Sequence, residues 1–192
     1  MRVVFLDIDG VLNHFGTNWE DVPWRRQPDG LLRVPIAPEC VVRLNRLTDE
    51  TRARIVISSS WRRFACWQDL GPALARHGVT GEVVGETPDL VSDAAWREMW
   101  RTRPRAPVEH EQIQRGMEIG EWLLAHPEVV SFAILDDGSD MVCLRPHLVQ
   151  TDPNVGLDDP DVESARRLLV GDLAGDGSAL DAWRAARRGE EP

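Results

Sequence analysis

The 192-residue sequence contains no lysine and no tyrosine, so all 22 of its basic residues are arginines. Any catalytic or phosphate-binding role that needs a cationic side chain therefore falls to arginine, whose planar guanidinium keeps its charge. Only three cysteines occur, at scattered positions without a CxxC pair. They predict neither a disulfide framework nor a zinc site, and they favour a reducing, cytoplasmic location.

Long apolar runs and net positive charge are missing as well. No run approaches the length of a bilayer span, and Asp7 interrupts the apolar N-terminal run, so we expect neither a membrane association nor a signal peptide. The net charge of −10 argues against a surface that coats nucleic acid or anionic membrane as a whole. With 42% hydrophobic residues the chain can bury its own core, and no obligate protein partner is evident.

Short apolar runs alternate with helical patterns along the chain. The apolar runs lie at 2–6, 54–57, 130–135 and, more weakly, 147–151 and near 83–84. The helical patterns lie at 38–50, 61–77, 111–126 and from 158 or 159 to about 170. Continuous short apolar runs are typical of strands buried on both faces. The alternation predicts a three-layer α/β/α, Rossmann-like fold with a central parallel sheet of about five strands.

The prediction for domain organisation is one domain over residues 1–171. Within it, 13–37 is expected to form a flap-like insert and 86–110 an insert rich in Pro, Arg and Trp. The segment 172–192 is predicted to be a mobile tail. The Arg/Trp stretch at 96–105 could clamp a nucleic-acid strand, although such a stretch is more often an amphipathic helix with solvated arginines.

Polar residues stand where the apolar runs end. Asp7 and Asp9 follow the first run, Ser58–Ser60 the second, and Asp136 and Asp137 the third. In an open parallel sheet these positions meet at the carboxyl edge, where ligands bind. Carboxylates that converge there cannot all stay ionised without a cation, and oxygen-only ligands suit Mg²⁺. The pattern predicts a magnesium-assisted phosphoryl-transfer site with these four aspartates as candidate ligands; which of Asp136 and Asp137 binds stays open.

Three segments resemble motifs of the haloacid dehalogenase (HAD) superfamily. Residues 5–13 (FLDIDGVLN) closely resemble its first motif, residues 55–61 (IVISSSW) its second and residues 134–140 (ILDDGSD) its fourth, in that order. The resemblance spans about residues 1–170. The Ser-Ser-Trp-Arg run is similar to a subgroup of small HAD domains, some of which occur in RNA-repair proteins. The resemblance implies the HAD fold and a Mg²⁺-dependent phosphatase.

The resemblance also implies roles for the residues of the first motif. Asp7 would be the nucleophile that forms an aspartyl-phosphate. Asp9 would protonate the leaving oxygen and later activate water, with its backbone carbonyl facing the metal. Gly10 would let the backbone approach the phosphate. Because dehalogenases of the superfamily lack the second Asp and its transport ATPases carry Thr there, Asp9 favours phosphatase or phosphomutase chemistry.

In the second motif Ser59 would hydrogen-bond a phosphoryl oxygen, with Ser58 as the register alternative and the backbone N–H of Ser60 assisting. The three serines could also merely cap a helix that starts at Trp61, which would account for one of them. Asp140 is interpreted as a helix cap or loop charge rather than an outer metal ligand.

The third motif of the family is normally Lys or Arg, and Arg115 is the chosen residue. A residue at the head of the helix before the fourth-motif strand lies over the carboxyl edge, and Arg115, Ile119 and Trp122 share one helical face. A competing apolar face consists of Ile113, Met117, Gly120 and Leu124. Arg103 or Arg105 is the alternative.

The expected function is hydrolysis of a phosphomonoester. A phospho-accepting receiver is disfavoured because its acceptor Asp ends a later strand and its Lys is absent here. An HAD-like module that binds a phosphorylated ligand without turnover remains the alternative. The inserts at 13–37 and about 79–110 are too short for a full cap domain, so we expect an open site. An open site suits a nucleotide or nucleic-acid end, which is slightly favoured over a small metabolite, although the net charge of −10 does not favour a nucleic acid.

Overall fold

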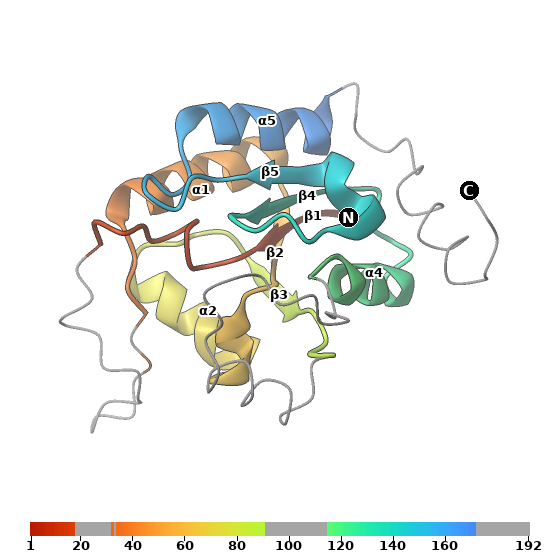
Figure 1. Cartoon of the computed structure of the whole chain (residues 1–192), viewed down its shortest axis with the longest axis horizontal. Coiled ribbons are helices and arrows are strands. Elements are labelled where there is room, and N and C mark those ends of the chain that lie inside the picture. Colours follow the sequence, from red (N-terminus) through yellow and green to blue (C-terminus); the bar gives the residue numbers. More distant parts are fainter. Residues whose placement is uncertain (18–31, 33, 91–114, 172–192) are drawn as a thin grey trace, which may run out of the picture.

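The computed structural model describes residues 1–17, 32, 34–90 and 115–171. Its strands are β1 (Arg2–Leu6), β2 (Arg54–Ile57), β3 (Val83–Glu86), β4 (Ser131–Asp136) and β5 (Leu148–Gln150). They form one parallel sheet in the order β3-β2-β1-β4-β5 (Figure 1). The prediction of a five-stranded parallel sheet with the first strand at its centre is confirmed.

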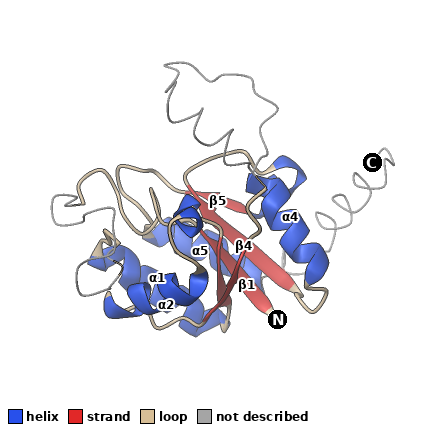
Figure 2. Ribbon diagram, turned by 90° about the horizontal axis from the view of Figure 1, so that it is seen from below, coloured by secondary structure: helices blue, strands red, loops and turns tan. Residues whose placement is uncertain are grey.

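Helices cover both faces of the sheet and complete three layers. They are α1 (Pro38–Thr51), α2 (Trp67–Arg76), α4 (Arg115–Ala125) and α5 (Asp159–Val170), with 3₁₀ turns η1 (Ser60–Arg63) and η2 (Val142–His147). The first, second and fifth helices pack on one face and α4 on the other (Figure 2). Because side chains alternate along a strand, Val4 and Leu6 of β1 enter one apolar cluster and Val3 and Phe5 the other.

None of the described helices is long and apolar enough to cross a membrane.

Local signals explain where α5 begins. Asp158 accepts a hydrogen bond from the Asp161 N–H at 2.9 Å, and the Asp161 carboxylate accepts one from the Asp158 N–H at 3.1 Å. This capping box satisfies two helix-end donors, and Pro160 in the first turn loses no intrahelical bond. The predicted start at 158 or 159 is thus confirmed.

The prediction of one helix over 61–77 is wrong. Ser60–Arg63 instead form a 3₁₀ turn, and α2 begins only at Trp67. The Arg62 guanidinium folds back and donates to the carbonyls of Ser58 and Ser59, at 3.0 and 2.8 Å. The N–H of Trp67 donates to the Glu86 carboxylate of β3 at 2.8 Å. This bond satisfies a free N–H at the first residue of α2.

Most of the predicted inserts and the tail lie outside the described residues, as do the Arg/Trp stretch at 96–105, Arg103, Arg105 and Ile113. The described end of the first insert is buried in the core at Leu32, Val34, Ile36 and Ala37. The N–H of Ala37 donates to the carbonyl of Leu12 at 2.8 Å, so this end is fixed to the loop after β1.

Candidate active site at the carboxyl edge of the sheet

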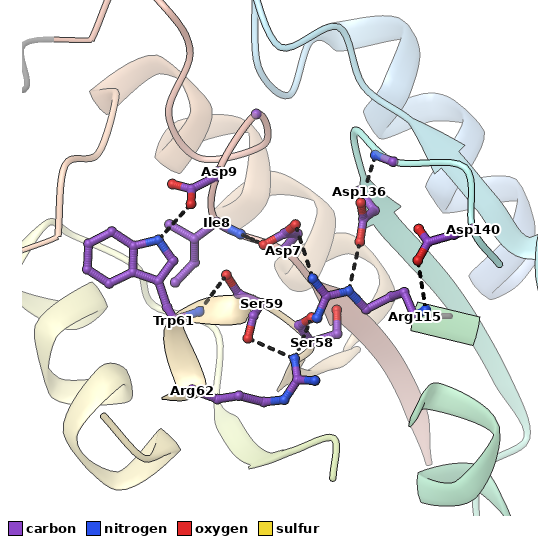
Figure 3. Close-up of polar contacts among 12 residues, drawn as sticks. Asp7, Ile8, Asp9, Ser58, Ser59, Trp61, Arg62, Arg115, Asp136 and Asp140 are labelled. Carbon is purple, nitrogen blue, oxygen red and sulfur yellow. Dashed lines mark hydrogen bonds and ion pairs between the residues drawn. The ribbon is translucent and has the colours of Figure 1, made fainter. Parts of the chain in front are cut away.

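The sheet ladder continues one residue past the central strands and sets the predicted site residues side by side. The N–H of Asp7 donates to the carbonyl of Leu135 at 3.0 Å, and the N–H of Ser58 donates to that of Leu6 at 2.9 Å. The ends of β1, β2 and β4 are therefore level, and the side chains that follow them face a common space (Figure 3).

Asp7 lies at the centre of this edge and is only 7% exposed. Its Oδ1 accepts the N–H of Ile8 at 2.7 Å. Burial raises the pKa of Asp7, and attraction to Arg115 and hydrogen bonds from Ser59 and Ile8 oppose that rise without cancelling it. Further positive charge beside Asp7 would therefore favour the ionised form of its carboxyl group.

Asp7, Asp136 and Asp137 each offer a carboxylate oxygen within 4.8 Å of the other two. Burial and repulsion by Asp7 raise the pKa of Asp136 to about 8, and burial raises that of Asp137. Oδ1 of Asp136 accepts the N–H of Gly138 at 2.8 Å, whereas its buried Oδ2 has no hydrogen-bond partner among the described residues. Crowded carboxylates with a buried oxygen that accepts no hydrogen bond fit a hard divalent cation.

Arg115, the first residue of α4, reaches two of these carboxylates. Its Nη2 is 3.8 Å from Oδ2 of Asp7, and its Nε is 3.5 Å from Oδ2 of Asp136. Burial alone would lower the pKa of Arg115, but attraction to Asp7 and Asp136 outweighs it and raises that pKa. Three carboxylates thus lie beside one guanidinium, and either a retained proton or an additional cation would balance their charge.

The orientation of α4 follows the predicted face. Ile119 and Trp122 are buried and Arg115 is partly buried, whereas Leu124 of the competing face is 36% exposed. The carboxylate of Asp140 accepts the N–H of Arg115 at 2.9 Å, so Asp140 acts at the helix start, as the cap interpretation has it.

Asp9 lies beside this group rather than in it. Its Oδ2 accepts a hydrogen bond from Nε1 of Trp61 at 3.0 Å, and its Oδ1 accepts one from Nδ2 of Asn13 at 2.9 Å. The Asp9 carboxylate is not one of the three that gather among the described residues. Its predicted contact with a metal, which uses the backbone carbonyl, stays a prediction.

Gly10 leaves space for the side chain of Asp137. Its φ is +72°, and a Cβ built there would lie 2.6 Å from Cγ of Asp137. The carbonyl of Gly10 accepts the hydroxyl of Thr151 at 2.7 Å, which fixes this turn against the segment after β5. A side chain at position 10 would therefore both strain the backbone and displace Asp137.

The serines after β2 have different partners. Ser59 lies beside Asp7 and lowers the pKa of its carboxyl group, and the Ser59 hydroxyl accepts the N–H of Trp61 at 3.3 Å, which caps η1. The predicted bond from Ser59 to a phosphoryl oxygen stays a prediction. The hydroxyl of Ser58 is buried and has no hydrogen-bond partner in the described part of the chain. Ser60 begins η1 and is partly exposed.

Sequence reasoning missed a buried ion pair behind the site. Glu118 is 4% exposed; it pairs with Nη2 of Arg62 and lies 3.6 Å from Nη1 of Arg115. Its other oxygen accepts the N–H of Leu90 at 3.2 Å. The spacing of Arg115 and Glu118, three residues apart on a helix, was the available signal. Glu118 therefore links the guanidinium in the site to the loop after β2.

Comparison with family models matched residues 3–162 to the HAD domain in Swiss Army Knife RNA repair proteins. The chain belongs to this HAD family. The predicted resemblance, including the RNA-repair subgroup, is thereby confirmed. Membership supports a phosphatase-type hydrolase, and HAD domains generally use Mg²⁺. No curated protein and no solved structure matched the chain.

Proposed function

We propose that this domain hydrolyses phosphomonoesters through an aspartyl-phosphate on Asp7. The supporting observation is the surroundings of that carboxylate: Arg115 lies 3.8 Å away on one side, and oxygens of Asp136 and Asp137 lie within 4.8 Å. A nucleophile of this kind must carry negative charge while it approaches an anionic phosphate. Fixed positive charge beside the carboxylate and the phosphate reduces the repulsion between them.

The reaction has two steps, and Asp9 moves the proton in each. A carboxylate oxygen of Asp7 attacks phosphorus, the bond to the leaving oxygen breaks, and Asp9 gives that oxygen a proton. Water then attacks the phosphorus of the aspartyl-phosphate while Asp9 takes back a proton. Inorganic phosphate leaves, and the carboxylate of Asp7 is regenerated.

The remaining site residues stabilise charge. Mg²⁺ bound by Asp7, Asp136 and Asp137 would supply positive charge that keeps these carboxylates ionised and offsets the charge of the phosphoryl group. Arg115 and the hydroxyl of Ser59 are close enough to Asp7 to bind oxygens of the same phosphoryl group. They would hold it in line for attack.

The substrate class that we propose is a phosphorylated nucleotide or nucleic-acid end. The family occurs in RNA repair proteins, which supports a polynucleotide. The inserts are too short for a full cap domain, which supports a site open to a large substrate. The stretch at 96–105, which lies outside the described residues, supplies arginines and tryptophans that suit a nucleic-acid strand.

The direct test is turnover of p-nitrophenyl phosphate and of oligonucleotides with a 5′- or a 3′-phosphate. We expect hydrolysis that needs Mg²⁺, stops in chelator, is poorly supported by Ca²⁺ and is abolished by Asp7→Asn without loss of the fold. Turnover that persists in chelator or in Asp7→Asn would contradict the proposal. Tight binding of a phosphorylated ligand without release of phosphate would instead identify a binding module.

The substrate class has a separate test in the arginines at 101 and 103. We expect the double variant Arg101→Ala, Arg103→Ala to lose turnover of oligonucleotides and to keep turnover of the aryl phosphate. The matched control removes two arginines of α5, Arg166 and Arg167, which pair with Glu163 away from the site. Equal rates in both double variants on both substrates would rule out a role for the stretch at 96–105.

A further inference from the structure

Trp61 connects the second motif to the first. It lies in η1, after β2, and is 3% exposed within the larger apolar cluster. Its indole Nε1 donates to Oδ2 of Asp9 at 3.0 Å, across 52 positions of sequence (Figure 3). A side chain that is otherwise part of the core therefore offers its one polar atom to the partly exposed carboxyl group of Asp9.

The two oxygens of Asp9 have donors from different parts of the fold. Nδ2 of Asn13 donates to Oδ1 at 2.9 Å, while Oδ1 of Asn13 accepts the N–H of Gly10 at 3.0 Å. Asn13 belongs to the same loop as Asp9, and its Nδ2 also donates to the carbonyl of Pro35 at 3.3 Å. Trp61 comes from η1, which follows the neighbouring strand β2, so its hydrogen bond fixes the carboxyl group of Asp9 relative to the second motif.

The position of the indole is itself well determined. The N–H of Trp61 donates to the hydroxyl of Ser59 at 3.3 Å, and the ring meets that of Phe64 edge-on, with centroids 6.3 Å apart. A buried tryptophan packed in this way occupies a single rotamer. Its Nε1 therefore has a fixed position from which it donates a hydrogen bond to Asp9.

We propose that Trp61 is a positioning residue that holds the carboxyl group of Asp9 for proton transfer to the leaving oxygen. This inference rests on the proposed function. A carboxyl oxygen can take part in more than one hydrogen bond, so the bond to Trp61 leaves Asp9 able to reach a substrate oxygen. Fixing a proton donor in the reactive geometry lowers the barrier because less freedom is lost in the transition state.

The test uses two substrates whose leaving groups differ in basicity. A nitrophenolate leaves readily without a proton, whereas the alkoxide of a sugar or of glycerol needs one. We expect Trp61→Phe to lower kcat/KM for glycerol phosphate or a phosphorylated oligonucleotide by about 10- to 100-fold, the range expected for one hydrogen bond to a charged group. For p-nitrophenyl phosphate we expect a change of less than about threefold.

Two further variants separate positioning from stability. Trp67→Phe is the matched control, since Trp67 also packs against the larger cluster and its Nε1 bonds no described residue. If Trp61→Phe does not fold, site-specific incorporation of benzothienylalanine at position 61 keeps the shape of the indole and removes only the N–H. In an Asp9→Asn background, Trp61→Phe should not lower kcat/KM for the alkyl phosphate any further, because Trp61 acts through Asp9.

The outcomes distinguish this inference from the proposed function. A selective loss on alkyl phosphates in the Trp61 variants, absent in Trp67→Phe, would support the positioning role. An equal loss on both substrates, no loss at all, or a full additional loss in the Asp9→Asn background would overturn it and leave the phosphatase assignment intact. If the unaltered chain turned over neither substrate with Mg²⁺, the proposed function would fail and this inference with it.

Discussion

Replacing Asp136 by asparagine should remove much of the pH dependence of stability that the metal-free protein shows between about pH 5 and pH 7. Burial and the neighbouring charge of Asp7 raise the pKa of Asp136 from 3.8 to about 8. Between these values the folded protein keeps a proton that the unfolded chain has released. The free energy of unfolding therefore falls as the pH rises through this window. Asparagine resembles the protonated carboxyl group and cannot ionise, so the variant lacks this contribution.

The size of the effect follows from one proton. A difference of one bound proton changes the free energy of unfolding by about 1.4 kcal/mol per pH unit, or about 3 kcal/mol from pH 5 to pH 7. For a domain of this size, about 1 kcal/mol corresponds to roughly 2–4 °C in Tm, so the profiles should diverge by about 6–12 °C. Other shifted groups, such as Asp161 with a pKa of about 6 and His77 with a lowered one, are common to both proteins and cancel in the comparison.

The assay is thermal unfolding of both proteins from about pH 5 to pH 7, first in chelator and then with excess Mg²⁺. In chelator, Tm should agree near pH 5, and the Asp136→Asn variant should melt higher near pH 7. Mg²⁺ should raise Tm of the unaltered protein most near pH 7, because the cation binds the ionised carboxylates, and should raise that of the variant less. Parallel profiles in chelator would refute the reasoning, and so would equal gains from Mg²⁺.

Three other substitutions test individual parts of the site. Asp9→Asn should lower kcat by about 10²–10⁴-fold at unchanged Tm, and near-normal steady-state rates would exclude it as the acid–base group. Arg115→Ala should lower kcat/KM by about 10²–10³-fold, with partial recovery in Arg115→Lys; equal activity of Arg115→Ala and the unaltered protein would remove it from the site. Gly10→Ala should lower both Tm and Mg²⁺ affinity because the added Cβ would clash with Asp137. In the control Gly71→Ala the added Cβ would make an ordinary contact 3.5 Å from Val83, so Mg²⁺ affinity should not change. The same Mg²⁺ affinity in both variants would contradict the crowding argument.

The parts of the fold that follow from local pattern were predictable. Residues 3–6 are apolar at successive positions because both faces of β1 are covered, and the same holds for 55–57 in β2 and 132–135 in β4. Since parallel strands end at one edge, the carboxylates that follow β1 and β4 had to converge there. The placement of Arg115 also followed, because a helix antiparallel to the strands starts at that same edge.

The parts that depend on contacts distant in sequence were not predictable. The helix expected from Trp61 is interrupted because Arg62 folds back onto the loop and pairs with Glu118, which lies 56 positions away. Likewise, nothing near Trp61 in the sequence shows that its indole reaches Asp9. Strand register determines which serine meets Asp7, and a row of three serines does not reveal that register.

The central claim is a covalent bond between phosphorus and the carboxylate of Asp7, and borohydride trapping measures it directly. Borohydride reduces an acyl phosphate to an alcohol, so an aspartyl-phosphate becomes homoserine and is located by mass spectrometry of peptides. With an alkyl phosphate substrate and Mg²⁺, quenched during turnover, homoserine should appear at position 7 and be absent without substrate or in chelator. Hydrolysis that proceeds with no trapped product, or with homoserine at another aspartate such as Asp9, would contradict the account.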